Sequence, residues 1–381
     1  MARDPILLTP GPTPVPPEVR EALGRPMGHH RTPEFQELLK EVGAGLKEVF
    51  GTAQEVLILT SSGTGAMEAA VSNLLSPGDE ALVIRGGKFG ERWGEIAAAF
   101  GVRADSIDVP WGKPLNLNQL SEQLARNPNI KAVFSTLCET STCVTFDIRG
   151  IRKAMGNSKA LLVVDAISGL GSESFAMDSF GVDVTVCGSQ KGLMLPPGLA
   201  FMALSPRAWE AVAQSRTPRY YFSLPVAKKA WESTDTPFTP AINLIVGLVE
   251  SLRRIRKIGV DRFVAAQKTH AEAVRKAVIA LGLELYADPA CASNGVTAVH
   301  VPAGVNGKEL LKKLRNQHNV ILAGGQGKEL EGKIFRIATM GAIGPEEIKV
   351  GLTALEQVLA EMGWKSPSPG AGVKALEAAL R

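Results

Sequence analysis

Short apolar runs alternate with helix-length segments through more than half of this 381-residue chain, and that alternation restricts the fold more than any other feature. The runs lie at residues 55–60, 81–84, 106–109, 132–136, 161–165, 182–187 and 199–204. Segments with helical spacing lie at 34–50, 66–75, 90–100, 117–127 and 148–155. Strands that alternate with helices predict an α/β fold, with a mostly parallel sheet covered on both faces. The unbroken run LLVV at 161–164 is typical of a strand buried on both sides.

The pattern changes after residue 239. A long helix with one apolar face is expected around 242–255, and a second helix at 261–281. A smaller α+β unit follows, with candidate strands at 296–301 and 334–339 and helices at 308–317 and 345–362. Residues 5–17 are rich in proline and glycine, which excludes a regular helix there. We therefore expect an N-terminal arm at 1–21, a large domain at 22–258 and a small C-terminal domain at 259–381.

Composition argues against several other classes of protein. The net charge is +4 and the basic residues are scattered, so no nucleic-acid surface is indicated. The four cysteines form no CxxC pair and no ligand spacing with histidine, which argues against a metal site and suits a reducing compartment. No apolar run approaches the ~18 residues that a membrane span needs. A cytoplasmic protein is the default expectation.

Three polar features follow predicted strands, where open α/β sheets bind their ligands. The segment Thr60–Gly65 (TSSGTG) offers hydroxyls and free helix N–H groups to a phosphate, although an ordinary capped turn explains it equally well. Asp165 ends one strand and Lys191 follows another; alone, each is more simply a turn carboxylate or a surface cation. Together they supply what pyridoxal phosphate (PLP) requires: an anion site, a partner for the ring nitrogen and an amine for the aldehyde.

At these motifs the sequence resembles a known family, the alanine–glyoxylate and serine–pyruvate aminotransferases, which are class V PLP-dependent enzymes of fold type I. The resemblance covers nearly the whole chain. It includes LTPGPTPVP, SSGTGAMEAA, CETST, LLVVDAISGLG, GSQKGLMLPPG, TPFTPAINL and KIFRIATMG. It implies a large domain with a seven-stranded, mostly parallel sheet and a smaller C-terminal α+β domain.

The resemblance also implies roles in binding the cofactor. Lys191 would form a Schiff base with PLP, and Asp165 would pair with the pyridinium nitrogen. Phe89 would stack on the ring, although a core phenylalanine is the simpler interpretation from sequence alone. The resemblance also implies a hydroxyl near the phenolic oxygen of PLP, that of Thr140. It implies a phosphate site made by Ser62, Gly63 and Thr64, with Gln190 nearby.

Two further implied roles concern the substrate and a second subunit. Arg336 matches an arginine that binds the substrate carboxylate; the alternative is a surface arginine on a strand. Thr239 matches a residue that reaches the phosphate of a neighbouring subunit, which implies a homodimer with shared sites. A nearby family position is often tyrosine, whereas this chain has Thr236. The hydroxyls of the loop at 234–240 have no obvious partner in their own chain.

These features predict an aminotransferase that moves the amino group of alanine or serine to glyoxylate or pyruvate by a ping-pong mechanism. Lys191 would act as the general base on the substrate Cα. One alternative is a cysteine desulfurase or lyase of the same fold, but Gln190 stands where desulfurases have histidine, and the loop at 323–333 has no cysteine. The other alternative is a non-catalytic accessory subunit, which the presence of both Lys191 and Asp165 disfavours.

Overall fold

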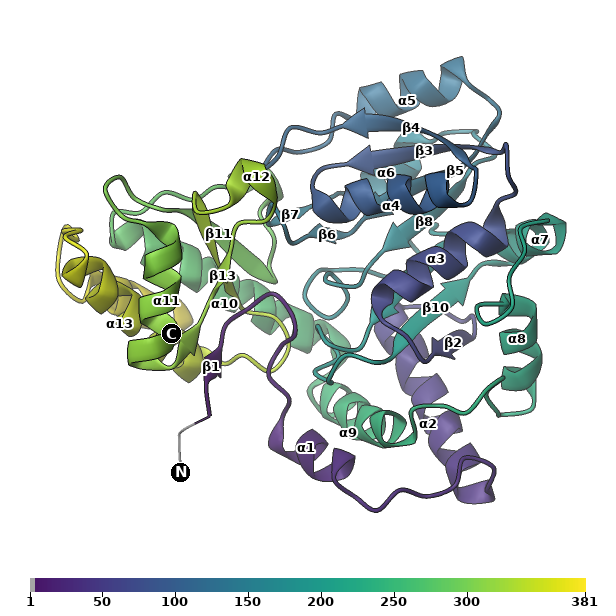
Figure 1. Cartoon of the computed structure of the whole chain (residues 1–381), viewed down its shortest axis with the longest axis horizontal. Helices are drawn as coiled ribbons and strands as arrows, with labels where there is room; N and C mark the ends of the chain where they lie inside the picture. Colours follow the sequence, from purple (N-terminus) through teal and green to yellow (C-terminus); the bar gives the residue numbers. More distant parts are fainter. Residues whose placement is uncertain (1–3) are drawn as a thin grey trace.

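A seven-stranded sheet is the centre of the computed structural model, which describes residues 4–381 (Figure 1). Its strand order is β2-β10-β9-β8-β5-β3-β4. All seven predicted apolar runs are confirmed as strands: β2 (Val56–Leu59), β3 (Glu80–Arg85), β4 (Arg103–Asp108), β5 (Ile130–Thr136), β8 (Leu161–Asp165), β9 (Val184–Gly188) and β10 (Ala200–Leu204). β8 has its predicted bounds. β4 begins earlier than predicted, because the first half of this edge strand is exposed and its sequence is not apolar.

The directions of these strands bring particular ends together. β9, β8, β5, β3 and β4 are parallel to one another, whereas β10, between β9 and β2, is antiparallel to both of them. In the register, Asp165 pairs with Thr136 of β5 and with Val186 of β9. The carboxyl ends of β5, β8 and β9 therefore meet at one edge of the sheet, which is where such folds bind ligands. The predicted α/β class is confirmed.

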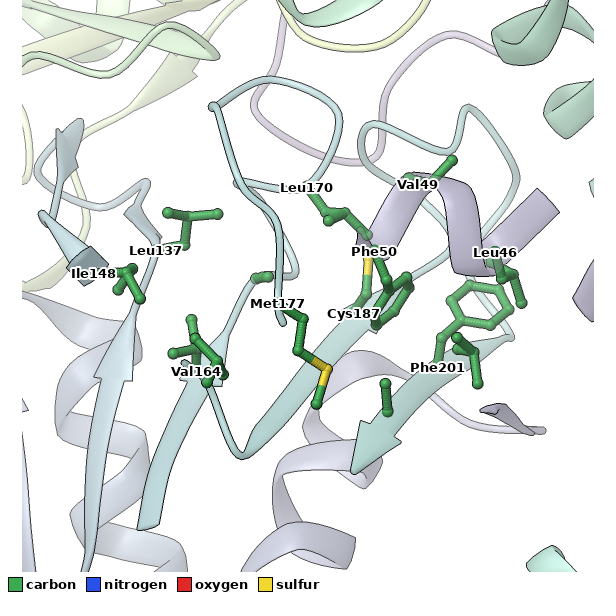
Figure 2. Close-up of a cluster of buried hydrophobic side chains, with 14 of the residues drawn as sticks. Leu46, Val49, Phe50, Leu137, Ile148, Val164, Leu170, Met177, Cys187 and Phe201 are labelled. Atoms are coloured by element: carbon green, nitrogen blue, oxygen red, sulfur yellow. The ribbon is translucent and has the colours of Figure 1, made fainter. Parts of the chain in front are cut away.

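Helices cover both faces of the sheet, and each layer has its own apolar core. On one face lie α2 (Pro33–Phe50), α5 (Leu117–Arg126), α6 (Ile148–Ala154) and α9 (Ile242–Ile258). Figure 2 shows Leu46, Val49 and Phe50 of α2 beside Cys187 and Phe201 of the sheet. On the other face lie α3 (Gly63–Leu74), α4 (Lys88–Ala99), α7 (Pro206–Gln214) and α8 (Leu224–Glu232). Burial on both sides explains why the central strands are apolar throughout.

The C-terminal part of the chain forms a second, smaller layered unit. Its antiparallel sheet has the order β11-β14-β13, made of β11 (Val296–His300), β14 (Ile334–Ala338) and β13 (Ala323–Gly324). Around it lie α10 (Val260–Ala280), α11 (Gly307–His318), α13 (Pro345–Glu361) and α14 (Ala371–Leu380). Figure 1 shows this unit beside the edge of the large sheet. Short elements complete the chain: the hairpin β6 (Cys138–Glu139) and β7 (Val144–Thr145), a 3-10 helix (Pro289–Cys291) and α12 (Gly327–Leu330).

The N-terminal arm connects the two units. β1 (Ile6–Leu7) pairs in parallel with β12 (Val320–Ile321) of the smaller unit, and Leu8 is buried in that unit's core. The chain then crosses to the large unit, where α1 (Pro17–Leu23) packs on α9. The division into parts at 1–21, 22–258 and 259–381 stays a prediction, and residues 1–3 lie outside the described part of the chain.

Within residues 4–381, no helix is both long and apolar enough to span a membrane. No group of three or more His, Cys, Asp or Glu side chains in this range is placed to hold a metal ion. The cysteines Cys138, Cys143, Cys187 and Cys291 are buried and not joined in disulfides.

Candidate active site

The segment between β2 and α3 presents a helix N-terminus at the sheet edge. Ser62 is the N-cap of α3, and its side chain makes no cap hydrogen bond. Gly65 N–H donates to Ser62 O at 2.9 Å, so the N–H groups of Gly63 and Thr64 are the ones available to a ligand. A Cβ at Gly63 would lie 2.8 Å from Ile167 Cγ1, so a larger residue there would force the Ile167 side chain to move. Ile167, two residues after Asp165, therefore packs directly against the predicted phosphate site.

Asp165 ends β8 as a buried carboxylate, with 3% of its surface exposed. Its Oδ1 accepts a hydrogen bond of 2.8 Å from Ile167 N–H. Burial raises the pKa of Asp165 to about 7, and the Ile167 donor and the nearby Lys191 charge offset part of that rise. A cation bound against this carboxylate would restore its ionised form.

Lys191 follows β9 and is also buried, with 9% of its surface exposed. Its Nζ contacts the carbonyl oxygen of Pro10. Burial lowers the pKa of Lys191 to about 8, although the Coulombic effects of Cys138 and Asp165 act in the opposite direction. The amine is thus easily made neutral, which is the form that attacks an aldehyde.

The N-terminal arm contributes contacts that the sequence prediction missed. Thr13 N–H donates to the Gln190 carbonyl at 3.0 Å, and Thr13 Oγ1 donates to the Lys191 carbonyl at 2.9 Å. A Cβ at Gly11 would overlap the Lys191 side chain, so glycine is needed where the arm passes the amine. The PGP sequence of the arm was a signal of close backbone approach, but nothing local showed what it approaches.

Phe89 lies in the first turn of α4 and is half-buried, outside both large core clusters. The Arg92 guanidinium lies 5.0 Å from the centre of the Phe89 ring. Arg92 Nη1 also donates to Thr64 Oγ1 at 3.3 Å. Arg92, which the sequence prediction did not single out, therefore connects Phe89 with the predicted phosphate site.

Arg336 is buried, with 4% of its surface exposed, so the alternative of a surface arginine is wrong. It lies on β14, where Nε donates to Gly324 O at 2.9 Å and Nη1 donates to Thr140 O at 2.7 Å. Burial lowers the pKa of this guanidinium, and Glu139 is among the charges that act against that shift. Thr140 and Arg336 are thus brought together, with Thr140 also buried.

Gly188 and Gln190, at and just after the end of β9, lie close to Gly63 at the start of α3. A Cβ at Gly188 would lie 3.0 Å from Gln190 Oε1 and 3.7 Å from the Gly63 Cα. Gln190 Oε1 is buried and has no hydrogen-bond partner among the described residues. The Gln190 amide therefore has unused capacity for a ligand close to the helix N-terminus at Gly63.

The loop at 234–240 differs from one expectation. Thr236 Oγ1 donates to Phe238 O at 2.8 Å, so this hydroxyl does have a partner in its own chain. The Phe238 ring stacks on Tyr221 at 5.1 Å, and Tyr221 Oη donates to Thr60 O at 3.4 Å. Thr239 is exposed, and it lines a small hollow together with Thr60.

This arrangement fits PLP on three counts. The helix N-terminus at Gly63 suits a phosphate, the buried Asp165 carboxylate suits a protonated ring nitrogen, and the Lys191 amine suits an aldehyde. The unpartnered Gln190 amide oxygen lies beside the first of these. The residues that could hold PLP are therefore contiguous in this fold.

Comparison with known proteins gives consistent matches over the whole chain. The family "Aminotransferase class-V" matches residues 7–331. The chain is 43% identical over 379 residues to the protein of Synechococcus sp. PCC 6716 named soluble hydrogenase, small subunit, covering 98% of each chain. It is 37% identical to the L-aspartate–glyoxylate aminotransferase of Paracoccus denitrificans, covering 95% of this chain and 92% of that one. It is 38% identical to the serine–glyoxylate aminotransferase of Hyphomicrobium methylovorum, covering 95% and 91%.

Among solved structures, the pyridoxamine–pyruvate aminotransferase of Mesorhizobium loti matches with a TM-score of 0.94 and 31% identity, covering 99% of this chain and 97% of that one. The family match, the named relatives and the solved structure thus indicate the same family. The chain belongs to the class-V aminotransferases, the PLP-dependent transaminases of fold type I.

Proposed function

We propose that this transaminase moves an amino group from a small amino acid, alanine or serine, to a small 2-oxo acid, glyoxylate or pyruvate, in a ping-pong sequence. The observation that carries the proposal is the buried Lys191 amine, with a pKa of about 8, in the electrostatic neighbourhood of Asp165 and Arg336. The proteins named serine–glyoxylate and L-aspartate–glyoxylate aminotransferase support glyoxylate as an acceptor.

PLP, when bound, supplies an electron sink for the negative charge that develops at the substrate Cα. Lys191 would be the residue that holds PLP through its aldehyde, and its ε-amine would serve as the base for the proton on the substrate Cα. Asp165 would hold a proton on the cofactor's ring nitrogen by staying negatively charged opposite it. Phe89 would pack on the ring, and Thr140 would lie near its phenolic oxygen.

The phosphate would bind at the N-terminus of α3, which draws on the free N–H groups of that helix. The proposed ligands there are Ser62, Gly63, Thr64 and Gln190. Arg92 already donates to Thr64 Oγ1, which leaves the Thr64 hydroxyl hydrogen free to point toward an anion.

Arg336 would bind the α-carboxylate of each substrate in turn, since an arginine fork matches a carboxylate. Arg92 is engaged by Phe89 and Thr64 on the phosphate side of the site. This arrangement favours monocarboxylate donors such as alanine and serine over dicarboxylates. The arm residues Pro10 and Gly11, which pack on Lys191, would help to exclude water from the charged reaction centre.

A donor–acceptor matrix tests the proposal. The purified holoenzyme should transfer nitrogen fastest from L-alanine or L-serine to glyoxylate or pyruvate, with parallel lines in double-reciprocal plots. L-aspartate and L-cysteine serve as comparison donors, and chromatography of the amino and oxo acids measures transfer. Sulfide release from cysteine without amino transfer would favour a desulfurase, and inertness toward every donor would favour an accessory subunit.

Capture of PLP by the cofactor-free protein should accelerate as pH rises, with a midpoint near the Lys191 pKa of about 8. Only the neutral amine attacks an aldehyde, and burial moves its appearance down from the ordinary lysine pKa of 10.5. Stopped-flow absorbance measures the rate, and borohydride followed by mass spectrometry locates the attachment. Attachment to another lysine, or a midpoint near the ordinary lysine pKa of 10.5, would contradict the assignment. Lys191→Ala is the control.

Arg336→Ala should raise the KM for the amino acid and for the oxo acid together, because one site serves both half-reactions. A charge-assisted hydrogen bond contributes about 1.5–3 kcal/mol, which corresponds to roughly 10- to 150-fold in KM. Steady-state kinetics with both substrates gives the values, and Arg336→Lys shows how much a charge without the fork retains. A change confined to the donor would argue against a shared carboxylate site.

We further propose that the active unit is a homodimer in which Thr239 reaches the phosphate site of the partner. Thr239 and Ser62 are exposed in the single chain, and the neighbouring Tyr220 has 82% of its surface exposed. Such an aromatic surface beside a binding site is typical of an interface.

Subunit exchange tests this arrangement. Lys191→Ala chains and Thr239→Asp chains should each be impaired alone, since the second places a negative charge against the phosphate. Mixed dimers should regain one competent site, made of Lys191 from one chain and Thr239 from the other. A site closed within one chain predicts no recovery, and a fully active monomer in sedimentation experiments would rule out the dimer.

A further inference from the structure

Glu139 is a fully buried carboxylate that none of the proposed steps uses. It lies on β6 within the CETST segment, with 0% of its surface exposed. Burial raises its pKa, and hydrogen bonds from its neighbours offset part of that rise. A carboxylate is kept in such a place only when donors surround it.

Its partners are backbone N–H groups at the start of α4. Glu139 Oε2 accepts from Phe89 N–H at 3.0 Å and from Gly90 N–H at 2.9 Å. Its other oxygen accepts from Ser141 N–H at 3.2 Å and from Ser141 Oγ at 2.5 Å. Ser141 Oγ in turn accepts from Lys88 N–H at 3.0 Å. Two side chains from a distant segment thus bind the first three N–H groups of this helix.

The helix has no cap of its own. The residue at its N-cap position is Gly87, which has no side chain to accept a hydrogen bond. A Cβ at Gly87 would lie 2.6 Å from the Glu139 Cδ, so a larger residue there would displace the carboxylate. Gly87 therefore leaves room for Glu139, which caps the helix in place of a local side chain.

The same short segment also faces the substrate side of the site. Thr140, between the two capping residues, accepts from Arg336 Nη1 through its carbonyl at 2.7 Å. Residues 139–141 thus contact the helix that carries Phe89 on one side and the proposed carboxylate-binding arginine on the other.

We infer that Glu139, supported by Ser141, is a positioning residue that fixes the first turn of α4 and so holds the Phe89 ring where the cofactor ring stacks. The inference rests on the stacking role proposed for Phe89. It assigns Glu139 no contact with substrate or cofactor; its effect is transmitted through the Phe89 backbone. The competing explanation is that Glu139 stabilises the fold without influencing the ring.

A double-mutant cycle on cofactor affinity separates these explanations. The variants are Glu139→Gln, Phe89→Ala and the combination, and the readouts are the Kd of the cofactor-free protein for PLP and the circular dichroism of the bound cofactor. Phe89→Ala should weaken the binding of PLP roughly 10-fold, which is the scale of one aromatic stacking contact. Glu139→Gln should weaken PLP binding by no more than that factor and should alter the dichroism of the bound cofactor. The double variant should have nearly the same Kd for PLP as Phe89→Ala alone.

Two more variants keep the test decisive. Ser141→Ala removes the hydroxyl that donates to Glu139 and accepts from Lys88 N–H. This variant should also weaken the binding of PLP, by a smaller factor than Glu139→Gln. Asp183→Asn is the matched control: Asp183 is another buried carboxylate, 4% exposed, which accepts from Leu162 N–H and Ser205 Oγ at the opposite end of β9. It should lower the denaturation midpoint and leave the Kd and the dichroism unchanged.

The contrary outcomes are distinct. If Glu139→Gln folds and leaves both readouts unchanged, or if its full effect persists in the Phe89→Ala background, the positioning role is wrong and the role of Phe89 stands. If Phe89→Ala itself has no effect on PLP binding, the stacking role and this inference fail together. If Glu139→Gln does not fold, an unchanged Kd and dichroism in Ser141→Ala would overturn the inference.

Discussion

The cost of removing charged groups from water governs the design of this site. Asp165, Lys191, Arg336 and Glu139 are all buried, and burial is the largest influence on the pKa of each one. Each is kept in place by specific partners: an N–H group for Asp165, backbone carbonyls for Lys191 and Arg336, and the start of a helix for Glu139. The rest of the fold supplies those partners. A looser fold would admit water and return the pKa of the Lys191 amine toward its ordinary value of 10.5.

Enclosure of the site depends on three parts of the chain that lie far apart in sequence. The strand ends of the large sheet supply Asp165 and Lys191, the smaller unit supplies Arg336, and the arm covers the lysine through Pro10 and Gly11. Residues 139–141 lie where the first two parts meet. The two units therefore do not merely adjoin; each completes hydrogen bonds that the other leaves open.

The sequence was sufficient wherever a local pattern carries the information. The segment LLVVD predicted β8 with its correct bounds, because a strand buried on both faces is apolar along its length and Asp165 is its last residue. The strand-end positions of Asp165 and Lys191 followed from the same reasoning. α7 and α8 were missed, although each begins with a serine N-cap and a proline in its first turn. Both are only 9 residues long, whereas helical periodicity is recognised most clearly over windows of roughly 11–18 residues.

Pairing between distant segments could not be predicted from the sequence. The reversed direction of β10, the contact of the arm with Lys191 across 181 residues and the cap of α4 by Glu139 across 50 residues leave no periodic trace in the chain. Each is decided by which surfaces meet in the finished fold. The glycines at 11 and 87 mark two of these meetings, but a glycine alone does not say what approaches it.

The pairing of β1 with β12 also has a consequence for how the protein is made. The ribosome synthesises residues 6 and 7 long before residues 320 and 321, their partners in the sheet. Until then Leu8, which is buried in the finished smaller unit, has no core to enter. The part of the arm that contacts Lys191 can dock on the large unit earlier, because Thr13 bonds to Gln190 and Lys191 there. Residues 6–8, although made first, are thus among the last to reach their places.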